Sequence, residues 1–242
     1  MTKIYIGCSG WYYREWSGDF YPEGLASKNY LRHYSTRFST VEINNTFYRT
    51  PTEKAIEAWY NSTPIEFKFS IKASRYITHI KRFHDCREEI KLLYTTLDIL
   101  AEKTGCFLFQ LPRTMIFTSE NLALIISQLN PHYKNVVEFR HPSWWNFEVI
   151  KAFENSDIGF CTVSGFNVPE DLMITGRKAY IRFHGDYTYS RSYSDKELSN
   201  WANKIKSANL EEAWIYFNNT AKGHATQNAL ELKQILTKQR IC

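Results

Sequence analysis

A short apolar run that recurs eight times along the chain is the feature that most constrains its fold. Each run is rich in β-branched or aromatic residues and is bounded by turn residues, which is typical of a buried strand. The eight runs are Ile4–Cys8, Thr40–Asn44, Phe67–Ala73, Cys106–Leu111, Asn135–Arg140, Ile158–Ser164, Ala179–His184 and Ala213–Asn218.

Amphipathic stretches separate these runs. The longest, Phe83–Thr104, has apolar residues at helical spacing, and a capping box at Ser194 and Glu197 predicts a helix over Asp195–Ser207. The other predicted helices are Asn29–Phe38, Glu53–Tyr60, Ser119–Leu129, Trp144–Asn155 and Thr220–Lys238. The connection near Pro169–Thr175 is weakly patterned and is predicted to hold no more than a helical turn.

Strands that alternate with helices in this way predict an α/β fold, a single-domain TIM-barrel-like (β/α)8 barrel over residues 1–242. Such barrels are typically ~250 residues long, close to the length of this chain. A doubly wound open sheet is the alternative. No linker or low-complexity segment interrupts the chain, and a composition of 43% apolar and 23% charged residues excludes a disordered or collagen-like protein.

The start of the chain, its cysteines and its charge bear on the compartment and the partners. The chain enters a strand-like pattern at once, and no run approaches the ~20 apolar residues that span a bilayer, so we expect a cytoplasmic protein without a membrane partner. Five widely spaced cysteines without a C-x-x-C pair fit a reducing compartment. The net charge of +5 permits an anionic ligand, although a solvated basic surface is the simpler explanation.

Charged side chains lie near the carboxyl ends of the predicted strands, where barrel enzymes build their sites. Side chains alternate between the interior and the helix layer along each strand of a barrel, which puts Glu138 with Arg140 on one face of their strand and Arg182 with His184 on one face of theirs. Because buried charges are costly without partners, the charges that face the interior are expected to converge. They are Glu42, Lys72, Glu138, Arg140 and Arg182, whose three positive and two negative charges leave a formal +1. This surplus predicts a pocket for an anion. The alternative is a self-satisfied network, for example Glu42 with Arg182 and Glu138 with Lys72, that locks this end of the barrel.

The same residues supply candidates for chemistry. If the protein is an enzyme, acid/base catalysis by Glu138 or Glu42 is favoured, with His184 as a third catalytic candidate. The residues expected to bind the ligand are Lys72, Arg75, His79, Gln110, Arg140, His141, Trp144, Arg182, Asn44, Asn218, Trp11 and Tyr48. Lys72 is interpreted as an anion clamp, with a Schiff-base lysine as the alternative.

Cofactor motifs are absent from the sequence. Glutamates and histidines could in principle assemble a zinc or manganese site, but no H-x-x-x-H, H-E-x-x-H or D-x-D spacing occurs, and the nearby cations would repel a metal. No G-x-G-x-x-G, P-loop or G-x-S-x-G motif supports a nucleotide cofactor or a serine hydrolase. We therefore expect neither a metal nor a cofactor.

Several strand-end segments together resemble one family, the YecE-like proteins, also called domain of unknown function 72. The resemblance covers nearly the whole chain and rests on GCSGW at 7–11 with Trp16, Phe20–Pro22, Val41–Tyr48, Lys72–Arg75, Gln110–Pro112, EFRHPSW at 138–144, Arg182–Gly185 and Tyr216–Asn219. It implies a TIM-barrel-like fold and no particular chemistry, because the family has no established reaction. Cys8, Asn45 and Arg113 stand where Thr, Ser and Pro are common in the family.

Three functional hypotheses follow from these observations. The favoured one is a barrel that binds or transforms an anionic small molecule, phosphorylated or carboxylated. A nucleic-acid-binding or nucleic-acid-processing barrel is the alternative, because the basic balance and the many aromatic residues suit phosphates and bases. A non-catalytic interaction scaffold, in which the ion network is structural, is the second alternative.

Overall fold

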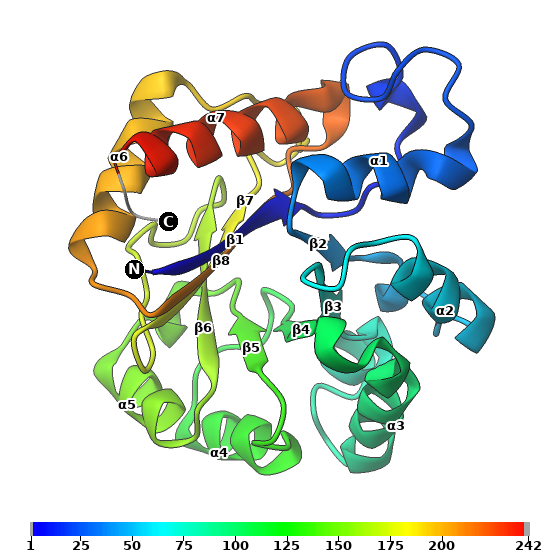
Figure 1. Ribbon diagram of the computed structural model, residues 1–242. Coiled ribbons are helices and arrows are strands. Elements are labelled where there is room, and N and C mark those ends of the chain that lie inside the picture. The colour runs from blue at the N-terminus through cyan, green and yellow to red at the C-terminus, as the bar shows by residue number, and fades with distance from the viewer. Residues whose placement is uncertain (1, 240–242) are drawn as a thin grey trace.

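Eight parallel strands form the centre of the molecule, and helices surround them (Figure 1). The computed structural model describes residues 2–239, so Cys242 lies outside the described residues. The strands are β1 (Lys3–Cys8), β2 (Thr40–Ile43), β3 (Lys68–Lys72), β4 (Thr104–Gln110), β5 (Asn135–Glu138), β6 (Gly159–Ser164), β7 (Lys178–Phe183) and β8 (Glu212–Phe217). Each predicted run overlaps one of these strands, and the predicted TIM-barrel-like α/β fold is confirmed.

The strands follow the order β1-β8-β7-β6-β5-β4-β3-β2, and every hydrogen-bonded pair is parallel. β1 and β2 pack closely and are linked by an isolated bridge between Ser9 and Glu42, where the Gly10 amide donates to the Glu42 carbonyl at 2.8 Å. Gly7 makes this approach possible, because a Cβ atom there would lie 2.1 Å from the Thr40 carbonyl oxygen. The ring of strands is therefore nearly closed.

Seven helices form the outer layer within residues 2–239 (Figure 1). They are α1 (Tyr30–Arg37), α2 (Glu53–Asn61), α3 (Arg87–Leu97), α4 (Ser119–Gln128), α5 (Phe147–Asn155), α6 (Asp195–Ser207) and α7 (His224–Lys238). α6 has the predicted bounds, and its capping box between Ser194 and Glu197 is present. β6 and β7 are joined by an irregular segment over 165–177.

Three predicted helices are wrong in extent. Phe83–Thr104 is not one helix, because Phe83 is buried in a left-handed turn with φ of 67°, α3 begins only at Arg87, and Ala101 breaks the later turn with φ of 46°. The helix predicted over Trp144–Asn155 begins later than expected, at Phe147. Asn146 caps it, and the Asn146 side chain accepts a hydrogen bond from the Val149 amide at 3.0 Å.

The last helix starts later than predicted for a similar reason. Residues 221–223 form a short 3-10 turn, in which Lys222 has φ of 61°, and Gly223, with φ of 74°, precedes α7. A left-handed residue interrupts the helical hydrogen-bond pattern whatever the apolar spacing around it. Apolar periodicity alone therefore overestimates the length of all three helices.

Two apolar cores flank the sheet. The larger lies between the strands and the helices and includes Val137 and Phe139 of the β5 region. The smaller fills the barrel interior with Tyr5, Cys106, Leu108, Val136, Cys161, Val163, Tyr180, Trp214 and Tyr216. The rings of Tyr5 and Trp214 stack at 4.0 Å. The interior is thus a packed core at its amino end, which leaves the carboxyl end as the place for a site.

Candidate functional site

The buried side chain of Arg182 is the centre of the polar interior. From β7, its Nε and Nη2 atoms donate to Oε1 of Glu42 at 3.1 and 2.7 Å, and its Nη1 atom donates to Oε2 of Glu138 at 2.5 Å. All three side chains are at most 1% exposed. Arg182 therefore joins β2, β5 and β7, and the predicted convergence of these charges is observed.

Both glutamates have further partners. Glu42 accepts from the Ser9 hydroxyl at 2.7 Å and from the Tyr180 hydroxyl at 2.6 Å. The second carboxylate oxygen of Glu138 pairs with Nε of Arg140. Burial alone would raise the pKa of Glu138, but the positive charges of Arg140 and Arg182 outweigh it and lower that pKa to about 2. Glu138 is therefore ionised and fully engaged at neutral pH.

The self-satisfied network expected as an alternative is partly present. Glu42 pairs with Arg182 as that alternative predicted, whereas the predicted pair of Glu138 with Lys72 is wrong. Glu138 instead takes Arg140 from its own strand end and Arg182 from β7, because these two cations lie nearer on the same interior face. Lys72 is left outside the network.

His184 lies directly above this network and is fully buried. Its Nδ1 atom is 3.0 Å from Nδ2 of Asn218, and its Nε2 atom is 3.4 Å from Nη2 of Arg140. Burial lowers the pKa of His184 well below its ordinary value, and the charges of Arg140 and Arg182 lower it further. A neutral imidazole has one acceptor nitrogen and one N–H, so His184 can accept a hydrogen bond from Arg140 at Nε2 and then carries its proton on Nδ1, next to the side-chain amide of Asn218.

An open cavity of about 340 Å³ lies over Arg140 at the carboxyl end of the barrel. It is lined by His79, Gln110, Pro112, Arg113, Arg140, Phe166, Asn167, Val168, Tyr187 and Tyr189. The guanidinium of Arg140 stacks on the ring of Phe166 at 4.0 Å. No acidic side chain is among these lining residues, so the wall of the cavity is positive.

Lys72 and His79 contact the same ring, that of Phe47, and His79 lines this cavity. The Lys72 ammonium is 4.3 Å from the centre of the Phe47 ring, and the His79 ring meets the same phenyl ring edge-on at 5.2 Å. Burial and then the charge of Arg182 lower the pKa of Lys72 to about 8. Burial, followed by the charges of Lys72 and Arg75, lowers the pKa of His79 to about 4.

Other predicted ligand-binding residues lie elsewhere. Trp144 is fully buried in the outer core, where it stacks on Phe139 at 4.1 Å and donates to the Met115 carbonyl at 2.8 Å. Trp11 packs edge-on against Trp59 at 5.7 Å. Neither tryptophan lines the cavity, because each belongs to packing between the loops and the helix layer.

The remaining predicted residues border the carboxyl end without lining the cavity. Tyr48 is 76% exposed, and Arg75 is also exposed. His141 caps a short turn, where its Nδ1 atom accepts from the Ser143 amide at 3.3 Å. Asn44 keeps a buried Oδ1 atom without a hydrogen-bond partner in the described part of the chain.

Seven of the ten cavity residues were missed as ligand-binding candidates, and four of these seven are basic or aromatic: Arg113, Phe166, Tyr187 and Tyr189. Arg113 was noted in the sequence only as a departure from the family pattern. The other three come from the connections after β6 and β7, which carry no helical or strand periodicity. The sequence signal that could have identified them is the presence of aromatic and basic residues in irregular loops that follow strands.

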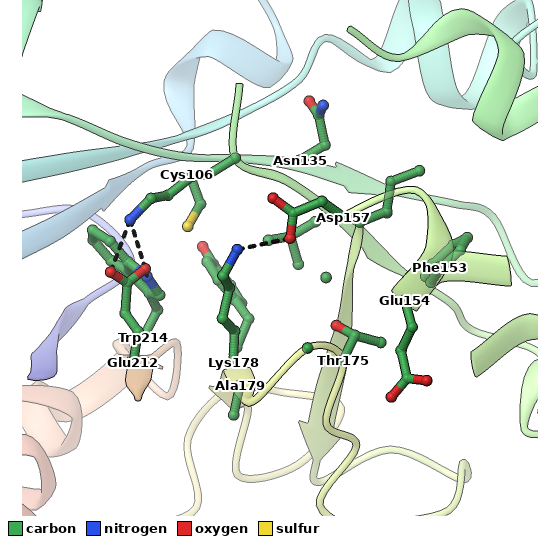
Figure 2. A pocket seen from close by; sticks show the side chains of 16 residues that line it. Cys106, Asn135, Phe153, Glu154, Asp157, Thr175, Lys178, Ala179, Glu212 and Trp214 are labelled. Carbon is green, nitrogen blue, oxygen red and sulfur yellow. Dashed lines mark hydrogen bonds and ion pairs between the residues drawn. The ribbon is translucent and has the colours of Figure 1, made fainter. Parts of the chain in front are cut away.

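A second, smaller hollow lies at the opposite end of the barrel, where β5, β6, β7 and β8 begin (Figure 2). Its volume is about 40 Å³, which suits water better than a substrate. Lys134 pairs with Glu212 at 2.7 Å, and Lys178 pairs with Asp157 at 2.7 Å. Neither lysine is left free for a ligand there.

Within residues 2–239, no group of three or more His, Cys, Asp or Glu side chains is arranged to hold a metal ion. None of the helices in the same range has the length and apolar character needed to cross a membrane.

Comparisons with known proteins point to one family. The family described as "Protein of unknown function DUF72" matches residues 5–241. UPF0759 protein YunF of Bacillus subtilis (strain 168) is 26% identical, over 96% of this chain and 94% of the relative. A DUF72 family protein from Thermotoga maritima MSB8 has a solved structure with a TM-score of 0.88 and 29% identity, covering 97% of this chain and 99% of that one. Another, from Enterococcus faecalis V583, has a TM-score of 0.79 at 20% identity, over 98% of each chain.

Proposed function

We propose that this chain, which belongs to the DUF72 family of proteins of unknown function, binds an anionic small molecule in the cavity over Arg140. The family membership confirms the resemblance seen in the sequence. The observation that carries the proposal is the position of Arg140, a guanidinium that lines the cavity and is fixed on its inner side by Glu138 and His184. A phosphoryl or carboxylate group is the natural partner of such a group.

The charge balance supports an anion. The negative charges of Glu42 and Glu138 balance the positive charges of Arg182 and Arg140. The ammonium of Lys72 then gives the five side chains a formal net charge of +1. Arg113 adds a second positive charge to the cavity wall. The volume of about 340 Å³ suits a small metabolite.

The two glutamates serve positioning better than proton transfer in this arrangement. Both oxygens of each carboxylate are engaged, and Glu138 is ionised at neutral pH because its pKa is lowered to about 2. They hold Arg182 and Arg140 in fixed orientations, which lowers the entropy lost when an anion binds. His184 and Asn218 complete this support around Arg140.

Binding of inorganic phosphate and citrate, measured by calorimetry, tests the proposal. Arg140→Gln should weaken binding roughly 10- to 100-fold, because it removes a charge-assisted contact. Arg32→Gln is the matched control, since Arg32 is exposed on α1. Because Arg140→Gln also leaves Glu138 without one partner, Arg113→Gln is the second variant, and it should weaken binding about 3-fold without changing the melting temperature. Anion affinity that none of these variants changes would contradict the proposal.

A second candidate function, binding of single-stranded nucleic acid, is favoured by one observation. Tyr48, Tyr76, Tyr187 and Tyr189 are exposed on loops that follow strands, and Arg75, Arg82 and Arg113 lie on neighbouring loops. Bases stack on aromatic rings, and basic residues bind phosphates. Fluorescence anisotropy with a short oligonucleotide at two salt concentrations tests this candidate. Affinity that falls steeply with salt and on Tyr187→Ala supports it, and no binding at low salt rules it out.

A further inference from the structure

Lys72 is half-buried at the end of β3, and its surroundings differ from those of Lys103, which is fully buried. The Lys72 amine lies against the face of Phe47, and no hydrogen bond or ion pair involves that amine within the described residues. Lys103, by contrast, donates to the carbonyls of Tyr60 and Thr63 at 2.6 and 2.8 Å. An amine that is half-buried and unpartnered at the mouth of the barrel is available to a ligand.

The groups around Lys72 favour its neutral form. Arg182 from β7 and Arg140 after β5 oppose its charge, whereas Glu138 and Glu42 favour it but are engaged by those arginines. With burial as the largest cause, the pKa of Lys72 falls from 10.5 to about 8. At neutral pH, the neutral amine is about 300-fold more populated than in an ordinary lysine.

We propose that Lys72 is a nucleophilic amine that forms an imine with an anionic aldehyde or ketone bound at Arg140. This inference rests on the proposed function and names its ligand class. Lys72 ends β3, and its neighbour on the Phe47 ring, His79, lines the cavity that contains Arg140 and Gln110. A carbonyl compound with a carboxylate or phosphoryl group can place the anion on Arg140 and the carbonyl carbon towards Lys72.

The chemistry balances without an oxidant or a metal. The neutral Nζ atom attacks the carbonyl carbon, a C–N bond forms as the C=O π bond opens, and one proton passes from the nitrogen to the oxygen through water to give a neutral carbinolamine. A second proton lets the C–O bond break, and the oxygen leaves as water. The protonated imine keeps one positive charge over the Phe47 ring, where the ammonium lay before, so the cation–π contact is retained.

Reductive trapping tests the inference in the full-length protein. The protein is incubated at pH 7 with glyoxylate, an anionic aldehyde, and sodium cyanoborohydride, and carboxymethylated lysines are located by peptide mass spectrometry. Lys72 should be modified at least about tenfold faster than Lys91, which is exposed on α3, and its rate should rise through a midpoint near pH 8. Lys72→Arg should abolish that modified peptide, and circular dichroism checks that the variant is folded.

Two comparisons separate this inference from the proposed function. Arg140→Gln and added inorganic phosphate should each slow the trapping of glyoxylate at Lys72 much more than the trapping of acetaldehyde, a neutral aldehyde whose rate reports only the change in the Lys72 pKa. Equal rates at Lys72 and Lys91 would overturn the imine inference, while Arg140-dependent phosphate binding would still support the anion site. If both aldehydes were trapped fast, and neither phosphate nor Arg140→Gln changed the two rates, the assignment of an anionic carbonyl ligand would be overturned.

Discussion

Two nitrogens of Arg182 donate to one carboxylate oxygen of Glu42, at 3.1 and 2.7 Å, and so tie β7 to β2 across the barrel interior. These strands are not neighbours in the ring, because β1 and β8 lie between them on one side. The third guanidinium nitrogen ties β7 to β5 through Glu138. One buried side chain thus fixes the spacing of three strands beneath the cavity.

Replacement of Arg182 should destabilise the fold strongly. Arg182→Met leaves the carboxylates of Glu42 and Glu138 buried with fewer partners, which typically costs about 3–5 kcal/mol. Arg177→Met is the matched control, because Arg177 pairs with Glu211 at 2.8 Å on the surface, where such a pair contributes about 1 kcal/mol or less. Urea denaturation of both variants measures the difference, and equal losses would show that the buried network is not structural.

The neutral state of His184 predicts a pH dependence of stability. Its folded pKa lies well below 6.5, so the unfolded chain binds a proton that the folded protein does not, and stability is lost as pH falls below 6.5. The unfolding free energy should fall as the pH is lowered through this range, by at most about 1.4 kcal/mol per pH unit on account of this residue. His184→Asn should remove that part of the decrease, whereas His132→Asn, at an exposed position, should keep it. The same slope in all three proteins would contradict a neutral buried His184.

Local signals explain what the sequence could predict. The eight strands are short apolar runs between turns, and α6 begins at a capping box, so both were recognisable from neighbouring residues. Alternation along β5 and β7 correctly placed Glu138, Arg182 and His184 in the interior. These features depend on the period of a strand or helix and not on distant contacts.

The rest depends on contacts between distant segments. Whether Glu138 pairs with Lys72 or with Arg182 depends on how far each side chain reaches across the ring, which alternation does not specify. No local sequence pattern indicates that Trp144 packs in the outer core against Phe139. Phe166 and Tyr187 reach the cavity from irregular connections, whose paths are set by packing against other loops.

Burial of the thiols predicts their reactivity. Cys8, Cys86, Cys106 and Cys161 are free and buried, and burial raises the pKa of all four, that of Cys86 to about 11. Since the thiolate is the reactive form, these thiols should not react with Ellman's reagent in the folded protein. The Cys242→Ser variant restricts the assay to these four. They should all react in guanidinium chloride, and rapid reaction without denaturant would contradict the packing described.

Gly7 should tolerate no side chain, because β1 passes close to β2 there. A Cβ atom at Gly7 would lie 2.1 Å from the Thr40 carbonyl oxygen and 2.7 Å from the Tyr34 hydroxyl, so one of the strands must move. Gly7→Ala should therefore cost about 3 kcal/mol or more, at the upper end of the cost of overpacking. Gly159→Ala on β6 is the control, since its nearest contact is a Val136 methyl group at 3.0 Å, which can shift by a few tenths of an ångström. Thermal unfolding should show a clearly larger loss for Gly7→Ala, and a smaller loss than for Gly159→Ala would mean that β1 and β2 do not close the ring at this point.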